Sequence, residues 1–62
     1  MIAKSVPFSK MIRQLRINFG ETQQELATLL NKSESTVRMW ELGKSEPNIQ
    51  TLILLAKHYN VT

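Results

Sequence analysis

Apolar residues near the start of the chain recur at the spacing of an amphipathic helix. The pattern predicts a helix over about residues 8–18, with one apolar face that packs into a core. This face consists of Phe8, Met11, Ile12, Leu15 and Phe19. Gly20 follows and is expected to end the helix in the left-handed conformation. Residues 1–7, which end in Pro7, are expected to form an N-terminal arm.

A second helix is predicted to begin after Thr22. Thr22 and Glu25 have the spacing of a capping box, in which each side chain bonds to the backbone N–H of the other residue. The apolar residues expected to be buried are Leu26, Ala27, Leu29 and Leu30. Asn31 tolerates the left-handed conformation, so we expect the helix to stop there.

A third helix is predicted from its N-cap Ser33 to Leu42, with Gly43 just beyond its end. Glu34 lies in the first turn, where the helix dipole favours a negative charge. The inward residues are expected to be Val37 and Trp40, and the outward ones Ser35, Arg38 and Met39. A helix that buries one narrow stripe and leaves such residues outward can present them to a partner.

A fourth helix is predicted after a connector over residues 44–47, with Asn48 as its N-cap and Asn60 at its end. Its buried stripe is expected to consist of Ile49, Leu52, Ile53, Ala56 and Tyr59. Leu55 should lie at the edge of this stripe and Leu54 on the opposite side. No strand pattern or repeat appears, so the sequence predicts an all-α, compact bundle of four, or five, short helices.

Length and composition narrow the functional classes. A chain of 62 residues forms one domain, and it contains no Cys and a single His, so neither a disulfide nor a multi-histidine metal site can stabilise it. The net charge of +3 and the isoelectric point near 9.7 favour a polyanionic partner. No apolar run is long enough to cross a membrane, and no signal peptide is evident, so we expect no membrane partner and a cytoplasmic protein.

The sequence offers no constellation of catalytic residues. It has no nucleophile next to a base, no carboxylate pair at a useful spacing and no cluster of metal ligands. His58 is isolated on the fourth helix, where we expect it to be solvated or at the edge of the core. We therefore expect a protein that is not an enzyme and that uses no cofactor and no metal.

One set of residues at fixed offsets resembles a known family. The set is Thr22-Gln23-Gln24-Glu25-Leu26-Ala27, Ser33, Thr36-Val37, Trp40-Glu41-x-Gly43-Lys44, Pro47 and Leu52. It resembles the Cro/C1-type helix-turn-helix regulators, also called the XRE family, over about residues 12–59. The resemblance implies a lambda-repressor-like domain over residues 8–62, with its helix-turn-helix at about 22–42. It also implies a transcriptional regulator, repressor-like, that binds a specific double-stranded DNA sequence with its third helix in the major groove.

The resemblance also assigns DNA-contacting residues. Base contacts are expected from Glu34, Ser35, Arg38 and Met39, and phosphate contacts from Thr22, Gln23, Ser33, Thr36 and Lys44. The forked guanidinium of Arg38 fits O6 and N7 of guanine, although it could instead bind a phosphate or pair with Glu34, four residues earlier. Glu21 and Glu46 are acidic where phosphates approach, which argues for weaker backbone binding.

Two further residues are expected to be structural rather than DNA-contacting. By resemblance, Arg16 on the first helix and Glu41 on the third form a partly buried salt bridge. Trp40, next to Glu41, is expected to belong to the core rather than to stack on a base.

Two partner hypotheses remain open. In the first, a homodimer binds a pseudo-palindromic operator in a bacterial or phage-encoded system, on the nucleoid, because one such module reads only a few base pairs. In the second, the domain is a protein-binding module, such as an antitoxin that holds a toxin or another protein. Its contacts would then include apolar residues that lie off the buried stripes: Ile17, Leu42 and Leu54.

Overall fold

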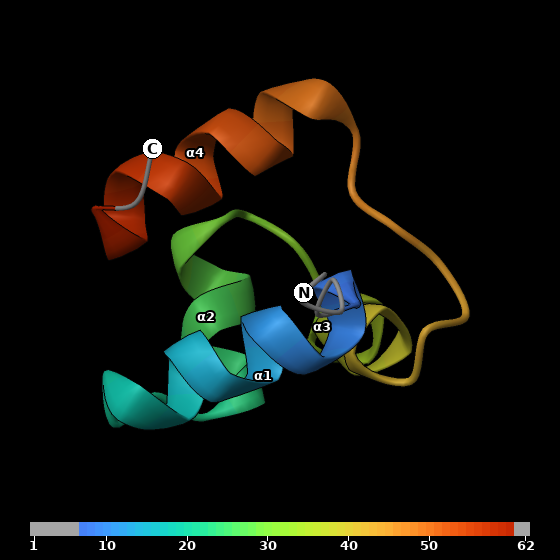
Figure 1. Ribbon diagram of the computed structural model, residues 1–62, viewed down its shortest axis with the longest axis horizontal. Coiled ribbons are helices and arrows are strands. Elements are labelled where there is room, and N and C mark those ends of the chain that lie inside the picture. The colour runs from blue at the N-terminus through green and yellow to red at the C-terminus, as the bar shows by residue number, and fades with distance from the viewer. Residues whose placement is uncertain (1–6, 61–62) are drawn as a thin grey trace, which may run out of the picture.

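The computed structural model describes residues 7–60 and contains four helices packed around one core (Figure 1). They are α1 (Phe8–Asn18), α2 (Gln23–Leu29), α3 (Glu34–Glu41) and α4 (Ile49–Tyr59). No strand occurs within the described range, and the predicted all-α class is confirmed. Residues 1–6, which make up most of the predicted N-terminal arm, lie outside the described residues.

Side-chain caps define where three of the helices begin. At α2, Thr22 Oγ1 accepts from the backbone N–H of Glu25 at 3.0 Å, and Glu25 Oε1 accepts from the backbone N–H of Thr22 at 2.8 Å. These two bonds are the predicted capping box. Ser33 and Asn48 cap α3 and α4 in the same way, by accepting from the backbone N–H three residues later. Each predicted N-cap is confirmed.

Left-handed residues end the helices or follow them closely. Positive φ angles occur at Gly20 (68°), Asn31 (59°), Gly43 (75°) and Asn60 (55°). Asn60 is the C-cap of α4, and the chain turns at the other three before the next element. The predicted ends of all four helices are therefore confirmed, to within a residue or two.

The core lies between α1, α2, α3 and one side of α4. Its buried apolar residues are Ile12, Leu26, Ala27, Leu30, Val37, Trp40, Leu55 and Tyr59. Phe8 and Leu15 pack partly buried against this cluster. The ring of Phe8 contacts that of Trp40 edge to face, with centroids 6.5 Å apart. The indole of Trp40 is therefore covered by a side chain of α1 and belongs to the core.

The predicted orientation of α4 was wrong for Ile49, Leu52 and Ile53, whereas Tyr59 is buried as expected. The helix buries Thr51, Leu55 and Tyr59, whereas Ile49 is 72% exposed and Ile53 is 50% exposed. Leu55, expected at the edge, is therefore central. Most of the eleven residues of α4 are apolar, so its periodicity selects no unique face, and contacts with the rest of the fold decide the rotation.

Some other apolar residues that were expected in the core are on the surface. Met11 is 45% exposed, Leu29 is 52% exposed, and Leu52 of α4 is 38% exposed. Phe19 is 51% exposed, but its ring packs edge-on against Tyr59 with centroids 4.8 Å apart. A domain this small has too little interior to cover every residue of an apolar stripe.

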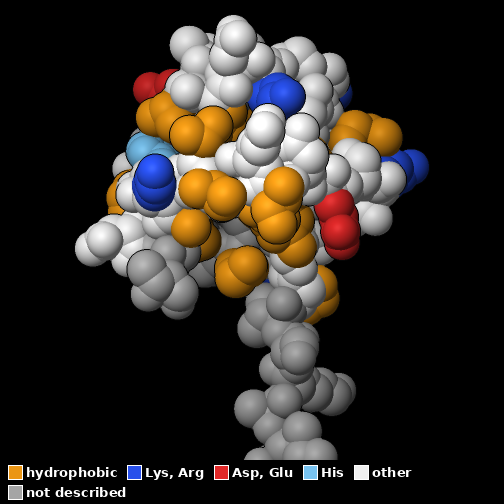
Figure 2. Space-filling view, turned by 90° about the horizontal axis from the view of Figure 1, so that it is seen from above, with side chains coloured by type: hydrophobic (Ala, Val, Ile, Leu, Met, Phe, Trp, Pro, Cys, Tyr) orange, Lys and Arg blue, Asp and Glu red, His pale blue; other side chains and the backbone are white. Residues whose placement is uncertain are grey.

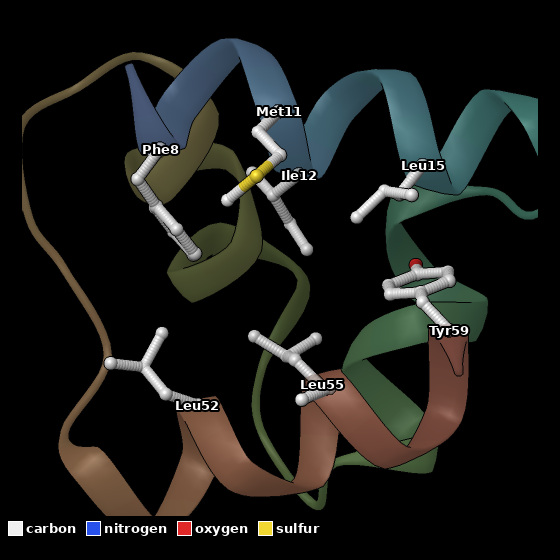
Figure 3. A pocket seen from close by; sticks show the side chains of 8 residues that line it. Phe8, Met11, Ile12, Leu15, Leu52, Leu55 and Tyr59 are labelled. Carbon is white, nitrogen blue, oxygen red and sulfur yellow. The ribbon is translucent and has the colours of Figure 1, made fainter. Parts of the chain in front are cut away.

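An apolar groove runs between α1 and α4. It encloses about 210 Å³, and Figure 3 shows side chains of the two helices pointing toward one another across it. The lining residues are Phe8, Met11, Ile12, Leu15, Leu52, Leu55, Ala56 and Tyr59. Apolar side chains also gather on the face of the molecule that Figure 2 shows. On α4, Ile49, Ile53 and Leu54 are exposed.

Candidate nucleic-acid interface

The outward face of α3 carries the four residues that were expected to contact bases. Glu34, Ser35, Arg38 and Met39 are all exposed, whereas Val37 and Trp40, on the same helix, are buried. Consecutive residues of an α-helix are about 100° apart, so these four form one continuous row opposite the buried pair. The core contacts of α3 thus fix which of its side chains face away from the protein.

Arg38 and Glu34 lie one helical turn apart in this row. Arg38 Nη2 and Glu34 Oε1 are 3.9 Å apart, and both side chains are about half exposed, at 52% and 47%. An exposed pair at this distance contributes little stability. The guanidinium of Arg38 is therefore free to exchange this carboxylate for another acceptor.

Hydroxyl groups cluster at the start of α3. Ser33 Oγ lies 2.8 Å from Thr36 Oγ1 and 3.2 Å from Ser35 Oγ, and it also accepts the capping bond from the backbone N–H of Thr36. Ser33 thus acts first as the cap, as expected. Thr36 is half-buried, and its hydroxyl is oriented by this cluster.

Gln23 stands at the first position of α2, and its side chain is already engaged. Its Nε2 donates to Glu41 Oε1 at 3.1 Å, across 18 residues of sequence. No sequence pattern indicates this bond, which holds the carboxamide beside α3. A carboxamide nitrogen has two N–H donors, so one remains for a further acceptor.

Arg16 and Glu41 form a two-point ion pair between α1 and α3. Arg16 Nε donates to Glu41 Oε2 at 2.7 Å and Arg16 Nη2 donates to Glu41 Oε1 at 3.1 Å. The side chains are only 13% and 5% exposed. The hydrogen bond to Glu41 raises the pKa of Arg16. A third donor, Nη1, bonds to the backbone oxygen of Glu21 at 2.7 Å.

Glu21 turns toward α4 instead of toward the proposed DNA surface. Its carboxylate accepts from Tyr59 Oη at 2.6 Å and bonds to His58 Nε2. Burial and then the hydrogen bond to Glu21 raise the pKa of Tyr59 above its ordinary value. The sequence does not indicate this link, because the residues that form it are 37 and 38 positions apart.

The loop after α3 presents Lys44 to solvent. The backbone N–H of Lys44 bonds to the carbonyl oxygen of Met39 at 3.0 Å, which fixes where the side chain leaves the fold. Lys44 and Glu46 are both exposed, so the loop offers one cation and one anion.

Within residues 7–60, no group of three or more His, Cys, Asp or Glu side chains could hold a metal ion. Within the same range, none of the helices combines the length and the apolar character needed to cross a bilayer.

Comparisons with known proteins agree on one family. The HTH_3 helix-turn-helix family matches residues 12–62. The chain is 36% identical over 55 residues to the HTH-type transcriptional activator BcrR of Enterococcus faecalis, and 39% identical over 57 residues to the HTH-type transcriptional regulator DicA of Escherichia coli. It is 35% identical over 54 residues to the cryptic phage CTXphi transcriptional repressor RstR of Vibrio cholerae. No solved structure matches the chain significantly.

The matches cover most of this chain but only part of each relative. They take in 89%, 92% and 87% of this chain and 27%, 42% and 49% of BcrR, DicA and RstR. The chain thus spans at most about half the length of these relatives. With its four-helix fold and the arrangement of α2 and α3, this match shows that the chain belongs to the HTH_3, or XRE, family of helix-turn-helix domains.

Proposed function

We propose that the chain is a transcription regulator's DNA-binding domain, which recognises a specific double-stranded sequence with α3 in the major groove. The observation that carries this proposal is the continuous outward row on α3, held in place by the buried Val37 and Trp40. The three relatives are named as a transcriptional activator, a regulator and a repressor, which supports the same function. We propose the domain bounds 8–62, with the helix-turn-helix at about 22–42.

The outward row supplies side chains for reading base edges. Arg38 is proposed to donate to O6 and N7 of a guanine, since its planar fork matches these two acceptors. Met39, 39% exposed, offers an apolar contact for the methyl group of thymine. Ser35 can donate or accept, and Glu34 is proposed to accept from cytosine N4 and to disfavour other bases.

Phosphate contacts are proposed at both ends of this row. The donors are Thr22, Gln23, Ser33, Thr36 and Lys44, which lie at the starts of α2 and α3 and in the loop after α3. Contacts of this kind set the register of the protein on the duplex without reading its sequence.

A single α3 spans too few base pairs for selective binding, so we propose that two copies bind as a homodimer. A two-fold symmetric pair would recognise a pseudo-palindrome with half-sites about 34 Å apart. We propose a repressor-like action, in which occupancy of the operator blocks polymerase. We propose that the protein acts in the cytoplasm, on the nucleoid.

Charge reversal at Arg38 tests the proposal. Arg38→Glu should abolish binding to duplex DNA, because it replaces a cation on the outward row with a group that phosphates repel. Its circular dichroism and unfolding midpoint should stay close to wild type, since the side chain is exposed. A folded Arg38→Glu variant that binds DNA as well as wild type would contradict the proposal.

The exposed apolar surface of α4 favours a second candidate function, the binding of a protein partner. On this helix, Ile49 is 72% exposed, Ile53 is 50% exposed and Leu54 is 51% exposed. Ile17 and Leu42, the other expected contacts, are 50% and 59% exposed. Under this alternative, Arg38→Glu would leave the function intact, whereas Ile53→Lys would remove it.

A further inference from the structure

A second surface feature lies beside the proposed DNA-reading row. An open hollow of about 250 Å³ is formed where α1, α2 and α3 converge. The residues that line it are Arg13, Gln23, Arg38, Glu41 and Leu42. Two arginines from different helices therefore border one concave site, and Arg13 has no place in the motif that identifies the family.

The balance of charge in this hollow is positive. Glu41 is the only acid in its lining, and both oxygens of its carboxylate are occupied by Arg16 and Gln23. Within residues 7–60, no carboxylate lies within 4.0 Å of the Arg13 guanidinium, which is exposed. The Glu34 carboxylate, 3.9 Å from Arg38, holds that arginine only loosely.

We propose that this hollow binds one phosphate group of the DNA backbone and that Arg13 is its principal ligand. The volume has room for several water molecules, so a phosphate can enter without rearrangement of the walls. The guanidinium of Arg13 can donate two parallel hydrogen bonds to phosphate oxygens, and the unused N–H of Gln23 can donate a third. The inference rests on the binding of duplex DNA described under Proposed function.

The position of Arg38 indicates how the hollow contributes to DNA recognition. Arg38 borders the hollow and also belongs to the outward row of α3. A phosphate held by Arg13 therefore lies next to the bases that the row reads. Contacts from α1 set the depth and angle at which α3 enters the groove, while the row itself reads sequence.

The test compares Arg13→Ala with Lys57→Ala. Each variant removes one exposed cation, and Lys57 lies on α4, outside the hollow, so it controls for net charge. Affinity for a defined duplex is measured by fluorescence anisotropy over a series of salt concentrations. Arg13→Ala should lower the slope of log affinity against log salt by about one, the value for a single lost phosphate contact. Arg13→Lys should keep most of the slope.

A methylphosphonate scan then locates the contact. A neutral methylphosphonate replaces one phosphate of the duplex at a time. At one position the replacement should weaken DNA binding by wild type. It should leave the affinity of Arg13→Ala unchanged, because this variant already lacks the contact with that phosphate. Equal salt slopes for Arg13→Ala and Lys57→Ala would overturn the Arg13 site, whereas wild-type binding would still support the proposed function. A wild-type protein that binds no duplex would overturn both.

Discussion

Glu41 Oε1 accepts from both Arg16 Nη2 and Gln23 Nε2, each at 3.1 Å, so one oxygen atom of α3 joins the core of α1 to the start of α2. Through this oxygen the Arg16–Glu41 ion pair positions the side chain of Gln23, which is a proposed phosphate ligand. The positive charge of Arg16 also neutralises the Glu41 carboxylate, which lines the hollow proposed to hold a phosphate. The pair therefore serves stability and positioning together.

Removal of one partner should be costly. Arg16→Ala leaves Glu41, only 5% exposed, without its counter-ion, so we expect the free energy of unfolding to fall by about 3 kcal/mol. The double variant Arg16→Met, Glu41→Leu should lose less, because no unpaired charge is left inside. Urea unfolding followed by the fluorescence of the single tryptophan, Trp40, measures both. A single variant as stable as wild type would show that the pair is not needed.

The link between Glu21 and Tyr59 should show an interaction energy. Glu21→Ala removes the acceptor of a tyrosine that is 4% exposed, which should cost about 1–3 kcal/mol. Tyr59→Phe removes the donor. If the bond matters, the combined variant will lose less than the sum of the two single losses. Strict additivity in urea unfolding would argue against the link.

Tyr59 should make the domain sensitive to alkaline pH. Its pKa is raised in the folded state, so its contribution to stability is complete below the pKa of an unfolded tyrosine, about 10. That contribution is lost as the pH rises from this value toward the folded-state pKa. Because Tyr59 is the only tyrosine, tyrosinate absorbance reports it directly. Tyr59→Phe should flatten the fall in stability above pH ~10, and an equal fall in both proteins would exclude Tyr59 as its source.

Two adjacent leucines test the orientation of α4. Leu55 is 4% exposed and Leu54 is 51% exposed. Leu55→Ala should therefore cost about 2–5 kcal/mol through the cavity that it leaves, whereas Leu54→Ala should change stability by at most about 0.5 kcal/mol. Thermal unfolding of both variants measures these two losses of stability. Equal losses would mean that α4 has a different rotation.

The features that could be predicted from the sequence are those set by neighbouring residues. Three helices begin at a side chain that bonds to the backbone three residues later: Thr22 (with Glu25), Ser33 and Asn48. The second helix ends before Asn31, which adopts a left-handed backbone angle. Local interactions of this kind can be predicted from the sequence.

The features that could not be predicted depend on distant contacts. The rotation of α4 follows from packing that its own apolar pattern does not determine. The bonds from Gln23 to Glu41 and from Tyr59 to Glu21 join residues 18 and 38 positions apart. Nothing in the sequence pattern singles out Arg13, and only the convergence of α1, α2 and α3 places it beside Arg38.

We propose that α3 reads a specific DNA sequence through Arg38. The most direct measurement is selection of bound duplexes from a genomic fragment pool, with wild type and Arg38→Ala in parallel and Lys57→Ala as a matched charge control. We expect wild type and Lys57→Ala to enrich the same inverted repeat, and Arg38→Ala to lose the preference at one base pair of each half-site. No enriched sequence with wild type, or the same preference with Arg38→Ala, would contradict it.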